Sequence, residues 1–211
     1  MPSNTFHNLA LDKKKKLIEA AKQEFSSVPF YEASINRIIE KAGISRGSFY
    51  MYFESKDDIF EYILQSYKEE IKNIIDDTFK ENNGDFKKSF IMIFDKIINL
   101  IYSDDNNKIF FKNVLTGLNL KNENYIIPHK KEENCNEFEE LKKIINISNL
   151  NIKDDKTLID IFDIMISITM PLIFHTVIMD IQISSVREKY IRKLNLICEG
   201  IYKEDKNDKN I

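Results

Sequence analysis

Residues that interrupt helices are scarce in this sequence. Glycine occurs 5 times and proline 4 times in 211 residues. A β-sandwich or barrel of this length would need many turns, and turns draw on both residue types. Hydrophobic residues make up 43% of the chain, which is enough for one good core or for a small domain beside a larger one. The composition therefore predicts an all-α protein.

Apolar residues recur at helical spacing along most of the chain. Short helices are expected between residues 12 and 53, with Ser34 and Ser45 in N-cap positions and Gly43 as the residue that ends the middle helix. Ser55 is the expected N-cap of a longer helix. From there on we expect helices over 56–80, 86–103, 106–120, 136–148, 156–182 and 185–203.

Cysteine spacing and hydropathy indicate a soluble protein of a reduced compartment. Cys135 and Cys198 are far apart and have no metal-ligand spacing, so a cytosolic location is the default. The most apolar stretch, residues 164–179, is shorter than the roughly 20 residues that cross a bilayer. We interpret it as a buried helix, and we expect no signal peptide, since no apolar segment follows the N-terminus early enough.

The stretch GISRGSFYMYFESK, residues 43–56, combines a glycine turn with a cluster of aromatic residues. Phe49 and Phe53 are four residues apart and are expected to face the core. The neighbouring run Tyr50, Met51 and Tyr52 then lies outside the core, which an ordinary solvated helix would not favour. A recognition helix in the DNA major groove is covered only when DNA binds. Two helices joined by a glycine turn thus predict a helix-turn-helix.

Residues 34–60, SINRIIEKAGISRGSFYMYFESKDDIF, resemble the TetR family of transcriptional regulators. The resemblance implies a helix-turn-helix DNA-binding domain over residues 1–55. It also implies a larger helical domain for ligand binding and dimerisation over 56–203, with a tail, 204–211, that we expect to be disordered. Two residues depart from the family pattern: Ile39 replaces the usual alanine, and Tyr52 stands where many members carry histidine.

The resemblance also assigns roles in DNA binding. Arg46 resembles a base reader, because a guanidinium can bond O6 and N7 of guanine together. Met51 has thymine methyl groups as its expected contacts, and Gly47 allows close approach of the backbone. Phosphate contacts are expected from Ser34, Tyr50 and Lys56. The full predicted set is Ser34, Ser45, Arg46, Gly47, Ser48, Tyr50, Met51, Tyr52 and Lys56.

Aromatic and methionine residues are frequent between residues 86 and 180, where the family resemblance implies a small-molecule site. Such stripes also occur as plain core, and a lone histidine such as His129 is more often structural than a ligand. The candidates for contacts with an unknown effector are Tyr102, Phe110, Phe111, Tyr125, Met165 and His175.

Dimerisation is expected because one recognition helix contacts too few bases to be specific. The 156–182 helix is apolar nearly all round in its second half and must be covered on more than one side. In the family, the last two helices pair with their copies in a second subunit. The predicted interface residues on the last helix are Val186, Tyr190, Leu194, Ile197 and Ile201.

Charge distribution agrees mildly with DNA binding. Residues 1–60 hold 9 basic and 8 acidic residues within a chain of net charge -3. The run Lys13 to Lys16 can be read as phosphate contacts or as a solvated face.

Phosphate-binding loops, nucleophile elbows and paired catalytic carboxylates are absent from the sequence, and we expect no enzyme activity, cofactor or metal. The sequence thus predicts a repressor of a palindromic operator, released by a small apolar ligand. The rivals are an activator or ligand-independent regulator and, in another class, an all-α enzyme or adaptor.

Overall fold

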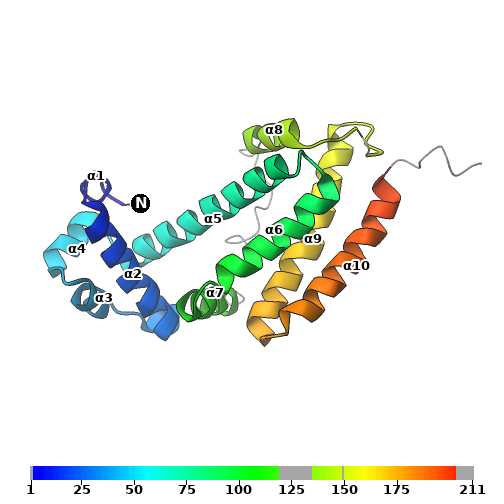
Figure 1. Ribbon diagram of the computed structural model, residues 1–211. Coiled ribbons are helices and arrows are strands. Elements are labelled where there is room, and N and C mark those ends of the chain that lie inside the picture. The colour runs from blue at the N-terminus through cyan, green and yellow to red at the C-terminus, as the bar shows by residue number, and fades with distance from the viewer. Residues whose placement is uncertain (1, 119–134, 149, 203–211) are drawn as a thin grey trace, which may run out of the picture. The chain divides into compact units, whose positions relative to one another are not determined.

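The computed structural model describes residues 2–118, 135–148 and 150–202. Within these ranges the chain is helical, and the only β-type pairing is an isolated bridge between Leu150 and Tyr202. The all-α prediction is confirmed (Figure 1). The elements are α1 (Asn4–His7), α2 (Leu11–Ser27), the 3-10 helix η1 (Phe30–Glu32), α3 (Ile35–Ala42), α4 (Arg46–Tyr52), α5 (Lys56–Glu81), α6 (Phe86–Ile101), α7 (Asp105–Leu118), α8 (Cys135–Ile144), α9 (Asp155–Met179) and α10 (Ile183–Ile201).

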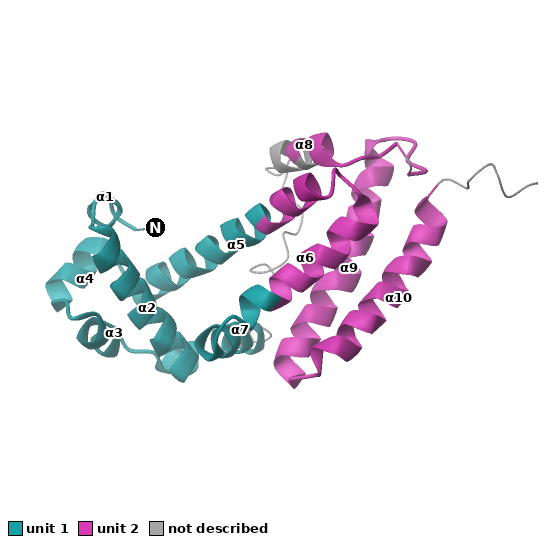
Figure 2. Cartoon of the chain, viewed as in Figure 1, with its two compact units in different colours: residues 1–73, 99–128 teal, residues 74–98, 129–211 magenta. Residues whose placement is uncertain are grey.

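The chain forms two compact units, shown in Figure 2. Unit 1 comprises residues 1–73 and 99–128, and unit 2 comprises residues 74–98 and 129–211. The boundary between the two units lies within α5, and the functional division expected at residue 55 stays a prediction. The boundary lies there because the first half of α5 buries Ile59, Ile63 and Tyr67 in the same core as the N-terminal helices. The expected tail, 204–211, lies outside the described residues.

The core of unit 1 is largely aromatic. Phe49 and Phe53 are almost fully buried, as predicted, and pack with Phe6, Leu17 and other apolar residues of α2 and α5. Burying a side chain of this size stabilises the fold by roughly 1.5–3 kcal/mol. The core therefore fixes α4 against the rest of unit 1 through one face and leaves its other face for solvent.

Helix α7 is attached to the end of α2 within unit 1. The amide Nδ2 of Asn113 donates to the carbonyl oxygens of Phe25 and Ser26 at 3.0 and 3.1 Å. The hydroxyl of Ser26 in turn donates to the carbonyl of Asn106 at 2.9 Å. These bonds satisfy carbonyl groups that the last turn of a helix leaves open. A displacement of α7 would therefore act directly on α2.

Unit 2 is built around α9 and α10. The ring of Tyr190 stacks on Phe94 with 4.5 Å between centroids, and its hydroxyl donates to the carbonyl of Phe90 at 3.2 Å. At the surface, Arg187 forms a two-pronged ion pair with Asp95 at 2.7 and 2.8 Å. These contacts dock α10 on α6 through side chains that point inward.

This docking corrects part of the predicted dimer interface. Val186, Tyr190 and Leu194 lie in the core of unit 2, with Leu194 0% exposed, so they cannot face another subunit. Ile197 and Ile201 are half-buried. The apolar spacing on α10 marks a stripe that needs cover, but Val186, Tyr190 and Leu194 find that cover within the protomer, since α6 and α9 also present apolar faces.

Helix α9 continues without interruption through Pro171, as the expected helix over 156–182 requires. One side of it, here called the α9 stripe, follows the helical repeat and comprises Ile164, Ile168, Pro171, His175 and Ile178. Ile164 is 48% exposed and Pro171 and His175 are exposed, whereas Ile168 and Ile178 are half-buried. By length and composition α9 is also the one helix in the described part of the chain that meets the requirement for crossing a membrane. Its opposite side, including Leu172 and Ile173, is buried inside unit 2.

Candidate nucleic-acid interface

The turn between α3 and α4 follows from one glycine and one serine. Gly43 adopts φ +67°, a left-handed conformation that costs glycine little, and its N–H donates to the carbonyl of Glu40 at 3.2 Å. Ser45 then caps α4, because its hydroxyl accepts from the N–H of Ser48 at 3.1 Å. Both predicted caps of the turn are thus present, and they set α4 at a fixed angle to α3.

The outward face of α4 carries an arginine, a tyrosine and a methionine. Tyr50 is 45% and Met51 56% exposed, and Arg46 is also exposed. The guanidinium of Arg46 donates to the hydroxyl of Tyr50 at 3.3 Å and lies 5.6 Å from the centroid of its ring. Gly47 lies on this face too; a Cβ at this position would meet nothing nearer than the Ser45 hydroxyl at 3.9 Å. A nucleic-acid backbone can therefore approach closely here.

Three of the predicted DNA contacts are partly engaged within the protein. The hydroxyl of Ser48 lies 2.9 Å from that of Ser45. Ser34 stands at the N-cap of α3 without a side-chain cap bond, and its N–H donates to Glu24. Tyr52 is half-buried with its ring 6.2 Å from that of Phe6, so its first contact is internal packing.

The N-terminal segment, residues 3–7, holds the end of α4, and sequence reasoning missed it. The N–H and hydroxyl of Ser3 donate to the carbonyl oxygens of Tyr52 and Met51 at 2.9 and 2.5 Å. The buried Phe6 packs its ring 4.7 Å from Phe53. A signal for this helix existed: a serine three residues before a lone phenylalanine in an otherwise polar stretch.

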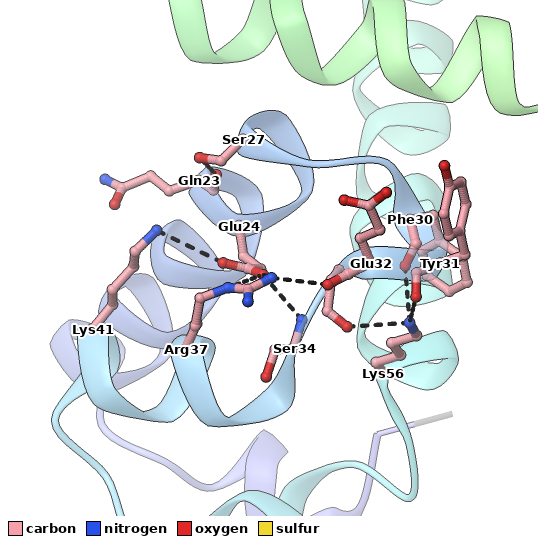
Figure 3. A network of polar contacts seen from close by, with 11 residues as sticks. Gln23, Glu24, Ser27, Phe30, Tyr31, Glu32, Ser34, Arg37, Lys41 and Lys56 are labelled. Carbon is pink, nitrogen blue, oxygen red and sulfur yellow. Dashed lines mark hydrogen bonds and ion pairs between the residues drawn. The ribbon is translucent and has the colours of Figure 1, made fainter.

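A buried carboxylate on α2 positions the start of α3. Glu24 accepts from the N–H of Ser34 at 3.0 Å and from Nε of Arg37 at 2.8 Å, with Lys41 at 3.9 Å (Figure 3). Burial by itself would raise the pKa of Glu24, but the hydrogen bonds from Arg37 and Ser34 and the charges of Arg37 and Lys41 lower it overall. A glutamate on the apolar stripe of α2 could have indicated a buried ion pair from the sequence, because acidic side chains are rarely buried without a partner.

Lys56 has a structural role in place of the expected phosphate contact. Its ammonium donates to the carbonyl oxygens of Phe30, Tyr31 and Ala33 at 2.9, 3.1 and 3.1 Å (Figure 3). A lysine ammonium has three N–H groups, and these bonds use all of them. Lys56 therefore fastens η1 to the start of α5, because the carbonyl groups that it binds belong to η1 and to the residue that follows it.

The predicted ligand contacts in the described residues are divided between the two units. Phe110 and Phe111 lie on α7 in unit 1, where their rings pack against Tyr67, and Tyr102 belongs to unit 1 as well. Met165 is buried in unit 2, whereas His175 is exposed on the α9 stripe. Tyr125 lies outside the described residues. At the α7 positions, the aromatic residues therefore serve as hydrophobic core, which was the alternative to a ligand site.

A cavity of about 190 Å³ in unit 2 has a polar lining. It is formed by Asn82, Asn83, Asp85, Asn146 and Tyr202, none of which sequence reasoning selected.

An exposed, N-capped second helix whose inner face is locked into a three-helix core defines a helix-turn-helix DNA-binding module. The comparisons agree. Residues 17–63 match the profile described as "Bacterial regulatory proteins, tetR family", and residues 85–201 match "Tetracyclin repressor-like, C-terminal domain". The chain belongs to the TetR family. The resemblance read from residues 34–60 is confirmed.

Similar proteins include two from Bacillus subtilis (strain 168). The uncharacterized HTH-type transcriptional regulator YdgC is 31% identical over 105 residues, which is 48% of this chain and 54% of that protein. A fatty acid metabolism regulator protein is 25% identical over 121 residues, 56% of this chain and 58% of its own. The chain thus spans a little over half the length of these two relatives.

Among solved structures, the fatty acid degradation regulator FadR from Bacillus halodurans is similar in fold. It superposes with a TM-score of 0.59 at 18% identity, covering 89% of this chain and 96% of that one. At this identity the likeness concerns the fold alone.

Proposed function

We propose that this protein is a homodimeric repressor that binds a palindromic operator through α4. The observation that carries the proposal is the outward face of α4, where Arg46, Tyr50 and Met51 are exposed while Phe49 is buried. A guanidinium suits guanine, a thioether suits thymine methyl groups, and a phenol can donate to phosphate. The cytosol, where DNA and reduced thiols occur together, is the proposed location.

The proposed dimer interface is the α9 stripe together with Leu196 of α10, which is 65% exposed. This set replaces the buried Val186, Tyr190 and Leu194 and leaves the half-buried Ile197 and Ile201 as predicted interface residues, because an isologous interface requires an apolar face that is not already covered. Two copies would place two recognition helices on half-sites about one helical turn apart or a multiple of it.

The proposed effector is a small, largely apolar molecule that binds the larger helical part of the chain and weakens operator binding. Two similar proteins are named as regulators of fatty acid metabolism or degradation, which favours fatty acids as the first compounds to test. A structural route exists on the protein side, since Asn113 ties α7 to the end of α2. Coupling of about 1–3 kcal/mol would change operator affinity roughly 5- to 150-fold.

DNA binding is tested by selection of bound sequences from a randomised double-stranded DNA library, followed by titration of the selected duplex at several salt concentrations. We expect Arg46→Ala to cost about 1–3 kcal/mol and to relax one base preference. Lys68→Ala, which removes a charge from an exposed position of α5, is the control and should bind like the wild type. Full affinity and unchanged base preference for Arg46→Ala would refute its role as base reader.

The effector is tested with a series of fatty acids of increasing chain length. Thermal shift first identifies binders, and the selected duplex is then titrated with each binder present. We expect binders to raise the melting temperature and weaken DNA binding. Binders that tighten DNA binding would indicate the alternative, an activator or a regulator that needs its ligand to bind DNA. Binders that leave DNA binding unchanged would indicate a ligand site that is not coupled to the DNA-binding helices.

A further inference from the structure

The base-reading arginine has a second partner, which lies on the other helix of the motif. Nη1 of Arg46 donates to Oδ1 of Asn36 on α3 at 2.8 Å, while Nη2 donates to the hydroxyl of Tyr50 on α4. We propose that Asn36 is a specificity-determining residue that acts through Arg46, by holding its guanidinium in one orientation toward the DNA. The proposal rests on the proposed function of α4 and adds a residue that no reading of the sequence selected.

The position of Asn36 follows from the turn that joins the two helices. Gly43 turns the chain sharply, and the N–H of Ile44 donates to the carbonyl of Ile39 at 3.1 Å. The long side chain of Arg46, in the first turn of α4, reaches Asn36 in the first turn of α3, so that residues ten positions apart in sequence share one hydrogen bond. Asn36 is exposed, as Arg46 is, so their bond is part of the surface that would meet DNA.

The two partners leave the arginine able to read a base. An arginine carries two N–H groups on each Nη and one on Nε, and all of them only donate. Asn36 takes one from Nη1 and Tyr50 one from Nη2, so each Nη retains a further N–H. Bidentate recognition of guanine needs two parallel N–H groups directed at O6 and N7. Arg46 can therefore keep both protein partners and bind guanine at the same time.

Holding the Arg46 side chain on two sides affects its preference among bases more than its attraction to DNA phosphates. A long exposed side chain loses rotamer freedom when it is fixed in a complex, and restraint in the free protein reduces that loss. An arginine that is free to swing can also reach neighbouring bases or phosphates, whereas one held by Asn36 and Tyr50 presents its fork in one direction. The positive charge is the same in both cases, so the attraction to phosphates is not expected to depend on Asn36.

The test uses the full chain, the randomised DNA library and five variants beside the wild type. Asn36→Ala is expected to lower guanine preference at one base position about 5- to 10-fold, the scale of one ordinary hydrogen bond, with an unchanged salt slope. Asn36→Asp keeps the acceptor and should retain the preference, with weaker binding to every sequence because a carboxylate now faces phosphates. In an Arg46→Ala background, Asn36→Ala should change nothing further. Asn73→Ala, at an exposed position of α5, is the matched control.

The outcomes separate this inference from the proposed function. A wild-type protein that selects no sequence would overturn both. A specific wild type with an unchanged preference in Asn36→Ala would overturn the inference alone. An effect of Asn36→Ala that persists without Arg46 would also overturn it, because Asn36 would then contact a base directly. Melting curves of all variants should coincide, since Asn36 and Arg46 are exposed.

Discussion

Two faces of this protein expose hydrophobic side chains, and their chemistry differs. On α4 of unit 1, Tyr50 and Met51 are interleaved with Arg46 and lie next to the Ser45 cap. On α9 of unit 2, the α9 stripe is apolar apart from His175. Donors mixed with apolar groups suit a ligand that is charged, hydrated and partly apolar, as the major groove is. A continuous apolar stripe suits another protein surface, because its hydrocarbon side chains form no hydrogen bonds and gain by being removed from water. The variants below test this difference, beginning with the largest expected effect.

A charge on the inner face of α10 should unfold unit 2. Leu194→Glu places an unpaired carboxylate at a position that is 0% exposed, which we expect to cost more than about 4 kcal/mol. Ser185→Glu, which adds the same charge at an exposed position of the same helix, is the matched control. Thermal unfolding followed by circular dichroism should show a large loss for the first variant and little for the second. Equal melting temperatures would mean that α10 is docked through a different face.

A charge on the outer face of α9 should separate subunits without unfolding them. In Ile164→Glu a symmetric interface would bury the new carboxylate twice, and we expect a folded monomer at micromolar concentration that has lost specific DNA binding. Sedimentation and DNA titration measure both effects. Gln65→Glu adds the same charge to an exposed position of unit 1 and should remain dimeric. A monomeric wild type would refute the assignment of the stripe without any variant.

Removal of the N-terminal anchor should loosen the α4 face. Phe6 is buried against Phe53 and Tyr62, and Phe6→Ala is expected to cost about 3 kcal/mol, the lower end for such a change, because α1 can detach on its own. Urea unfolding gives the free energy, and DNA titration shows whether α4 still binds. His7→Ala changes the exposed neighbour and serves as control. Unchanged stability and DNA affinity would show that residues 3–7 do not support α4.

The smallest effect is expected from the ion pair beneath α3. Glu24→Gln weakens charge-assisted bonds from Arg37 and should cost about 2 kcal/mol at neutral pH. The pKa of Glu24 is lowered from 4.5, so its contribution is present above that pH and is lost as pH falls through the folded-state pKa. The difference in unfolding free energy between wild type and variant should therefore shrink below pH 4.5. Glu19→Gln, on the exposed side of α2, should show no such trend.

Capping residues and apolar spacing, which act within a few residues, were sufficient to predict the helix-turn-helix. Gly43 and Ser45 act within a few residues of themselves, and Phe49 and Phe53 face inward because their spacing matches the helical repeat. The same local reasoning missed Glu24 and Asn36. Their partners are 13 and 10 residues away, and only the packing of α2, α3 and α4 brings them into contact.

The sequence by itself determined that this chain is helical, where most helices lie and which family it belongs to, because caps, breakers and apolar periodicity are properties of short segments. Only the tertiary structure decided which apolar face is covered by which neighbour. The stripe with Tyr190 and Leu194 became core, and the α9 stripe remained exposed, although both read as apolar helical spacing. It also decided that Lys56 binds carbonyl groups, since the partner of a flexible charged side chain depends on which acceptors the fold brings within reach.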